Sequence, residues 1–162
     1  MKKLLTLLFT IFLGTQMLLA DSTPLPSNAL TQKTIQRPKV RLEVQAANNE
    51  IEPYGIKLHD LESSLTSKLN LANILVESNY QNPLLLLRLK TVETGTDLAT
   101  FVQLAFFEEA ELIRNKSMIS AITWSQASLL TTSKKDFPAE VTKTVDSMLN
   151  SFIIEYNKAF TG

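Results

Sequence analysis

Cysteine is absent from this 162-residue chain, histidine occurs once, and glycine occurs only four times. Without cysteine the protein has no disulfide, no thiolate nucleophile and no cysteine-bound metal. The four glycines are scattered, so the sequence offers no glycine-rich loop for binding phosphate groups. These shortages exclude several kinds of chemical site, and they leave a hydrophobic core as the source of stability.

An excess of charge is missing as well, because 16 basic residues balance 16 acidic ones. Such a chain has no general attraction for nucleic acid or for an anionic lipid surface. The sequence therefore predicts no nucleic-acid partner. Its length favours one domain, which can bury about two thirds of its unfolded surface.

The first 20 residues, MKKLLTLLFTIFLGTQMLLA, are typical of a secretory signal peptide. Lys2 and Lys3 precede an apolar run that breaks at residues 14–16, too early for a spanning helix of roughly 20 apolar residues. Ala20 supplies a small residue for cleavage, and no cysteine is there to carry a lipid. We expect a bacterial periplasmic or secreted product without a membrane span. Retention of the segment as an anchor is the alternative.

Residues 21–39 are polar and contain three of the six prolines. This composition predicts a disordered tether before a single domain at residues 40–162. If the signal peptide is removed, 14 basic and 16 acidic residues remain, which gives a net charge of −2.

Hydrophobic periodicity predicts the elements of that domain. Residues 40–46 alternate strictly and favour a strand with its apolar face formed by Val40, Leu42, Val44 and Ala46. Leucines at helical spacing predict a helix over 56–70, followed by a short extended return. Further strands are predicted over 84–93, 100–113 and 118–132, and a helix capped by Asp136 runs to about Phe160. The order β-α-β-β-β-α indicates an α+β two-layer sandwich, a mainly antiparallel four-stranded sheet with both helices on one face.

The registers of the two predicted hairpins follow from their turns. A turn at residues 94–97 places Leu85 opposite Phe106. A two-residue turn at Asn115 and Lys116, with Asn115 at positive φ, pairs Arg114 with Ser117 and places Phe107 opposite Trp124. Both registers then agree on one apolar face for the helices to cover, which consists of Leu85, Leu87, Leu89, Val102, Leu104, Phe106, Ala127 and Leu129.

The opposite face is expected to be open and to carry an apolar patch. Leu84, Phe107 and Trp124 fall in one row across three strands, with Leu86 and Ile122 beside it. The polar side chains around them are Arg41, Glu43, Arg88, Lys90, Gln103 and Gln126. An apolar patch with a polar rim often marks a contact site, and aromatic residues dominate interface energies. We therefore predict a binding surface made of Leu84, Leu86, Phe107, Ile122 and Trp124.

Three alternatives to a binding surface remain open. Cross-strand aromatic pairs can serve only to stabilise a sheet, by about 0.2–1 kcal/mol each. The tether can fold back, with Leu25, Leu30 or Ile35 covering the patch. A β-bulge in the last strand can also turn Trp124 into the core.

Candidate catalytic groups are sparse. His59 and Asp60 are neighbours on the first predicted helix, where adjacent side chains point apart, so a triad with Ser63 is disfavoured. Glu108 points opposite to Glu109 and Glu111 on a strand, and the three are interpreted as a charged strand end. We expect no catalytic residue, no metal and no cofactor. A small periplasmic hydrolase using His59 or Glu109 is the alternative.

The signal peptide and the element order over residues 40–160 resemble small periplasmic domains of bacterial envelope-assembly proteins. In layout the chain is similar to the lipopolysaccharide-assembly lipoprotein LptE and to the amino-terminal domain of TolB, although it lacks the lipid-bearing cysteine of the former. The Thr-Trp-Ser strand followed by a terminal helix also resembles a set of secreted bacterial proteins of uncharacterised function. The resemblance implies a non-catalytic binding or envelope-assembly accessory protein, with an envelope protein or an amphiphile as partner. A self-associating structural domain, such as a homodimer, is a further alternative.

Overall fold

The computed structural model describes residues 37–47 and 51–161. Contacts divide the chain into two units, Met1–Ile35 and Gln36–Gly162, and the described residues all belong to the second. The predicted signal peptide and residues 21–36 of the predicted tether lie outside the described residues.

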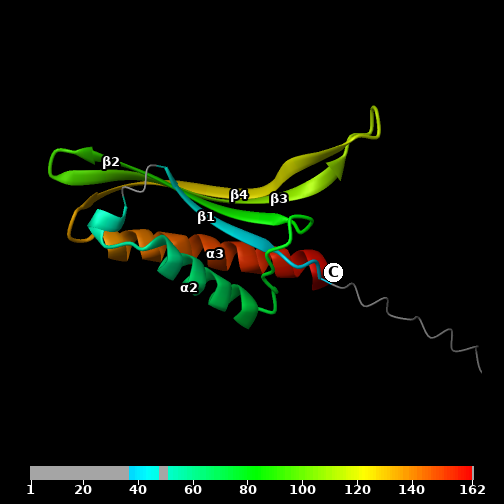
Figure 1. The fold of residues 1–162 in the computed structure, drawn as a ribbon, viewed down its shortest axis with the longest axis horizontal. Coiled ribbons are helices and arrows are strands. Elements are labelled where there is room, and N and C mark those ends of the chain that lie inside the picture. The colour runs from blue at the N-terminus through cyan, green and yellow to red at the C-terminus, as the bar shows by residue number, and fades with distance from the viewer. Residues whose placement is uncertain (1–36, 48–50, 162) are drawn as a thin grey trace, which may run out of the picture. The chain divides into compact units, whose positions relative to one another are not determined.

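The described chain forms one four-stranded sheet and two long helices. The elements are β1 (Arg41–Ala47), the short 3-10 helix η2 (Glu52–Tyr54), α2 (Leu58–Leu71), β2 (Leu84–Thr94), β3 (Asp97–Glu111), β4 (Met118–Ser133) and α3 (Phe137–Thr161). The strands lie in the order β1-β2-β3-β4, with β1 parallel to β2 and the other pairs antiparallel. Both helices cover the same face of the sheet (Figure 1). The predicted α+β class and the order β-α-β-β-β-α are confirmed.

The core lies between that face and the helices, where alternate strand residues meet the apolar stripe of each helix. Leu85, Leu87 and Leu89 of β2 are at most 1% exposed. α2 contributes the leucines predicted from its periodicity, Leu61, Leu65 and Leu69. α3 contributes the stripe Val141, Val145, Met148, Leu149, Phe152 and Tyr156. The apolar periodicities therefore predicted the core side of β2 and of both helices.

The segments that flank α2 are held by main-chain and side-chain contacts. After α2 the chain returns in extended form, as predicted, and Val76 forms an isolated parallel bridge with Val40. Residues 37–39, which were predicted to end the tether, contact α3 and this return. The Tyr156 hydroxyl donates to the Pro38 carbonyl at 2.7 Å, and Arg37 donates to Asn157 Oδ1 at 2.8 Å.

The β2–β3 hairpin has the predicted register. Leu85 lies opposite Phe106 and Leu84 opposite Phe107, as the pattern required. The connection is a two-residue turn at Gly95 and Thr96 between the paired Thr94 and Asp97. Gly95 has φ +68°, a left-handed conformation that a residue without a Cβ adopts without strain.

The β3–β4 hairpin has a different register from the predicted one. The Leu112 N–H donates to the Ser117 carbonyl at 2.8 Å, so the loop is four residues, 113–116, rather than a two-residue turn. Lys116, and not Asn115, has positive φ, at 58°. The longer loop moves the pairing by two positions, and Ile122 instead of Trp124 lies opposite Phe107.

A β-bulge then changes the register a second time. Phe107 pairs with Ile122 and Phe106 pairs with Trp124, so Thr123 is an extra residue on β4. Because strand side chains alternate, one extra residue exchanges the faces of everything that follows it. The predicted positions of Trp124 and Gln126 on the open face, and of Ala127 and Leu129 under the helices, are therefore wrong. The bulge is the alternative that the sequence had left open for Trp124.

Candidate binding surfaces

The open face carries an apolar row, which we call the row, formed by Leu84, Phe107 and Ile122. These residues pair directly across β2, β3 and β4. Leu84 and Phe107 are half-buried, whereas Ile122 is 55% exposed. Leu86 lies on the same face in the next pairing position but is only 3% exposed, so it adds almost no contact surface. Four of the five predicted site residues thus share the open face, and Trp124 does not.

A polar hollow adjoins the row. It has a volume of about 380 Å³, and its lining includes Arg41, Tyr80, Leu84, Phe107 and Glu109. The Arg41 guanidinium lies 4.7 Å from the centre of the Tyr80 ring and 3.6 Å from a Glu43 carboxylate oxygen. The row therefore has the polar rim expected of a contact site, built from β1 and from the segment before β2.

A second apolar pair lies farther along the open face. Phe101 of β3 and Leu129 of β4 are direct partners and are 40% and 72% exposed. Leu129 was predicted in the core because the predicted register of β4 contains no bulge. Once the bulge is placed, strand alternation puts Leu129 on the open face and Leu130 on the helix side.

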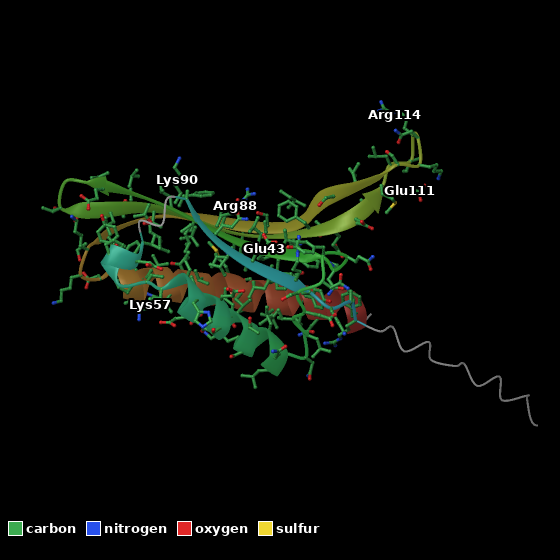
Figure 2. The ribbon with its side chains drawn as sticks, viewed as in Figure 1. Glu43, Lys57, Arg88, Lys90, Glu111 and Arg114 are labelled. Atoms are coloured by element: carbon green, nitrogen blue, oxygen red, sulfur yellow. The ribbon has the colours of Figure 1, made fainter. Side chains whose placement is uncertain are left out.

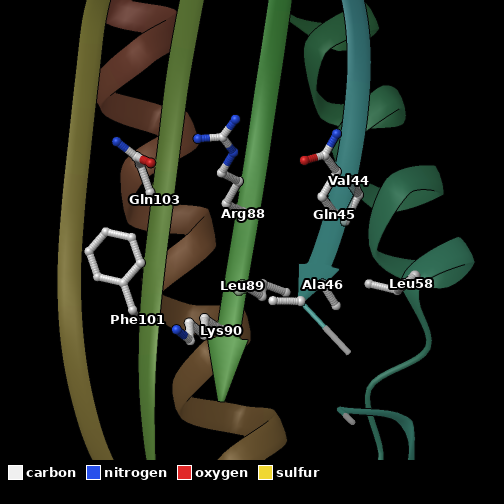
Figure 3. Close-up of a pocket in the computed structure, with 10 residues that line it drawn as sticks. Val44, Gln45, Ala46, Leu58, Arg88, Leu89, Lys90, Phe101 and Gln103 are labelled. Carbon is white, nitrogen blue, oxygen red and sulfur yellow. The ribbon is translucent and has the colours of Figure 1, made fainter. Parts of the chain in front are cut away.

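Two cationic side chains of β2 adjoin this second pair: Arg88 lies between it and the row, and Lys90 lies directly opposite Phe101. Arg88 and Lys90 point away from the helices (Figure 2). With Gln45, Phe101 and Gln103 they line a hollow of about 630 Å³ that reaches the end of β1 (Figure 3). Within the described residues neither Arg88 nor Lys90 has an ion-pair partner. Along β2 the open face is thus apolar at Leu84 and cationic at Arg88 and Lys90, and Phe101 and Leu129 continue the cross-strand row of Lys90.

Trp124 contacts α3 on the other side of the sheet. Its ring centre lies 5.3 Å from that of Phe152 in an edge-on arrangement. The two rings line a cavity of about 280 Å³ together with Phe106, Tyr156 and Phe160. Burial raises the pKa of Tyr156 to about 12, and the negative charge of Glu108 adds to the rise. The only tryptophan is therefore an aromatic support for α3, partly open to solvent.

The remaining candidate residues stand apart from one another. His59 and Asp60 are exposed in the first turn of α2, as predicted for solvent-facing helix residues. Glu108 lies on the helix side of β3, whereas Glu109 and Glu111 lie on the open side, and Glu111 pairs with Lys116 at 3.0 Å. Among residues 37–47 and 51–161, no three histidine or acidic side chains gather as a metal-binding group.

No protein-family model and no curated protein matches this chain. Among solved structures, a minor lipoprotein from Acinetobacter baumannii is distantly similar, with a TM-score of 0.36 and 15% sequence identity. The match covers 74% of this chain and 91% of the lipoprotein chain. In the described part of the chain, neither α2 nor α3 is long and apolar enough to cross a membrane.

Proposed function

We propose that the chain is a non-catalytic binding protein of the bacterial periplasm that contacts an envelope protein or an amphiphile through its open sheet face. The row is the observation that carries this proposal. A sheet face without covering helices is ordinarily polar, yet Leu84, Phe107 and Ile122 form a continuous apolar strip there. Exposed apolar surface of this kind is favourable to bury against a partner.

The order of side chains along the face favours an anionic amphiphile as the class of partner. The unpaired cation of Arg88 lies between the row and the Phe101–Leu129 pair, and that of Lys90 lies directly beside Phe101. A negatively charged head group over the cations would place apolar chains on either apolar surface. Charge-assisted hydrogen bonds from Arg88 would fix the head group, and burial of the chains would supply most of the affinity.

Site-specific photo-cross-linking tests this proposal with a control that the molecule itself provides. Ile122 on the open face and Ile154 on α3 are both isoleucine and both 55% exposed. A photoreactive side chain is placed at either position in cells that export the protein. We expect adducts of one defined mass from position 122 and none of that mass from position 154.

The mass of the adduct identifies the partner class. A lipid-sized adduct supports the amphiphile, and a discrete protein adduct supports an envelope protein. Arg88→Gln with Lys90→Gln should reduce a lipid adduct several-fold, because the head group loses its cations. Equal labelling at positions 122 and 154, or none at 122, would rule out the open face as the binding surface.

A further inference from the structure

The outer edge of β4 is unusually unprotected. In the described sheet β4 pairs with β3 on one side, and its other side ends the sheet. Edge strands ordinarily carry charges or prolines, or are short, because their unpaired N–H and C=O groups attract other strands. β4 has 16 residues without a charge or a proline, whereas β1 at the opposite edge has seven residues and includes Arg41 and Glu43.

The regular part of β4 is nearly symmetric about its middle. Beyond the bulge at Thr123, pairing with β3 continues without interruption over residues 125–133. Leu129 is the midpoint of this stretch. On the open face of residues 125–133, one large side chain is flanked by two small ones on each side, in the order Ser125, Ala127, Leu129, Thr131 and Ser133. Such an order is the same in both directions, so the strand matches a copy of itself running antiparallel.

We propose that β4 pairs with β4 of a second copy of this chain, antiparallel about a two-fold axis at Leu129. Leu129 then faces Leu129 of the second copy, and Ala127 faces Thr131. Each pairing joins residues of the same face, so the two sheets form one eight-stranded sheet with all helices on one side. This interface uses the strand edge and does not rest on the open-face proposal.

The side chains fit this arrangement on both faces. Leu129 is 72% exposed, and the pairing brings it beside its copy. Phe101, which is 40% exposed and pairs with Leu129, flanks the two leucines on either side in the same cross-strand row. On the helix side, Ser128 faces Leu130 of the second copy, so a small residue meets a large one. No charged residue of either β4 opposes another, so the strands approach without like-charge repulsion. A foreign strand could use the same edge, but the symmetry of the stretch favours a second copy.

Sedimentation of the purified full-length chain gives the first test. We expect a concentration-dependent dimer at micromolar protein. Leu129→Lys places two ammonium groups opposite each other at the axis and should return the mass to that of the monomer. Ile113→Lys is the matched control, because Ile113 is 90% exposed in the loop beyond β3 and should leave the dimer intact.

Cysteine variants test the register, since the natural chain has no cysteine. Directly opposed residues have Cα atoms about 4.5–5.5 Å apart, within disulfide range. Leu129→Cys should therefore cross-link two chains under mild oxidation. Ser125→Cys should not, because eight residues of strand, about 27 Å, separate the two copies of that position. A mixture of Ser125→Cys and Ser133→Cys chains should cross-link as a heterodimer.

Three results would overturn the proposal. One is a monomer at all concentrations tested. Another is a dimer that survives Leu129→Lys, which would place the interface elsewhere. The third is cross-linking of Ser125→Cys alone as efficient as that of Leu129→Cys, which would exclude the symmetric register even if β4 is the interface.

Discussion

The β2–β3 and β3–β4 hairpins share β3 but differ in the regularity of their strand pairing. β2 and β3 keep one register over eleven pairs, from Leu84–Phe107 to Thr94–Asp97. β3 and β4 change register at Thr123, after a loop with a non-glycine residue in the left-handed region. The regular hairpin lies over the helices with its inner residues fully buried. In the irregular hairpin the bulge places Trp124 on the helix side, whereas Ile122, which precedes the bulge, lies on the open face.

Turn chemistry and a single inserted residue together determine which side chains of β4 lie on the open face. The Gly95 turn can only close in one way at low energy, which fixes β2 against β3. The Lys116 loop has no such constraint, and its two extra residues shift β4 without exchanging its faces. Only the bulge exchanges them. Between the bulge and the loop at residues 113–116, the paired ends of β3 and β4 turn away from the helices (Figure 1).

The largest expected effect comes from removing the ring on which Trp124 rests. Phe152 is 1% exposed and contacts both Trp124 and Phe106. Phe152→Ala should lower the free energy of unfolding by about 3–5 kcal/mol and shift Trp124 emission to longer wavelength. Phe107→Ala, on the open face, should cost much less and leave the emission unchanged. Urea unfolding at one fixed protein concentration measures both, and an equal emission shift in the two variants would contradict the placement of Trp124.

The next effect compares helix-side residues of β2 and β4, the two strands that flank β3. Leu87 of β2 is completely buried, and Leu87→Ala should cost about 2–5 kcal/mol in free energy of unfolding. Ser128 of β4 also faces the helix side but is half-buried, and Ser128→Ala should stay within about 0.5 kcal/mol of wild type. Thermal and urea unfolding would show the contrast. Similar losses in the two variants would mean that the helices cover β4 as tightly as β2.

Deletions on either side of Trp124 should separate the role of the bulge from that of its neighbours. Deletion of Thr123 leaves a continuous ladder in which Trp124 still lies opposite Phe106, so we expect a change below about 1 kcal/mol and unaltered emission. Deletion of Ser125 also allows a continuous ladder, but with Trp124 opposite Ala105 on the open face.

Loss of the aromatic contact should then cost about 1 kcal/mol in the Ser125 deletion, with emission shifted to longer wavelength. Fluorescence spectra of the two purified variants suffice for the comparison. If deletion of Thr123 shifts the emission as much as deletion of Ser125, Thr123 is not the inserted residue.

The smallest effects concern the two turns and should have opposite signs. Gly95→Ala forces a side chain into the left-handed region and should destabilise by about 1 kcal/mol, although the added Cβ meets no atom within 4 Å. Lys116→Gly removes about 1–2 kcal/mol of strain and adds about 0.5–1 kcal/mol of unfolded-state entropy. The substitution also removes the exposed ion pair with Glu111, a loss near the lower end of about 0.2–1 kcal/mol. The net result should be a stabilisation below about 0.5 kcal/mol. A stabilising Gly95→Ala, seen in urea unfolding, would show that this turn is not the constraint on register.

Much of the fold could be predicted because its determinants are local and repeated. The spacing of Leu61, Leu65 and Leu69 indicated α2, and the alternation of Leu85, Leu87 and Leu89 indicated the inner side of β2. The β4 register could not be predicted, because Arg114, Asn115 and Lys116 permit loops of different length. Thr123 gives no sign of a bulge, since a β-branched residue is suited to any strand position.

The candidate site residues before the bulge were predicted on the correct face, and those after it were not. Leu84 and Phe107 were placed correctly because their pairing depends only on the Gly95 turn. Ile122 kept its predicted face because the longer loop moved β4 by an even number of residues. Trp124 is one position beyond the bulge and changed faces, and Leu129 was missed for the same reason. A local insertion thus removed one predicted contact residue and exposed another.

The bulge at Thr123 directs Trp124 to the helix side, and nuclear Overhauser effects from the indole ring of Trp124 can test this placement. The chain has one tryptophan, so its indole signals are unambiguous. We predict cross-peaks between the Trp124 ring and the ring of Phe152. Cross-peaks from Trp124 to the ring of Phe107, with none to Phe152, would place the tryptophan on the open face and exclude the bulge at Thr123.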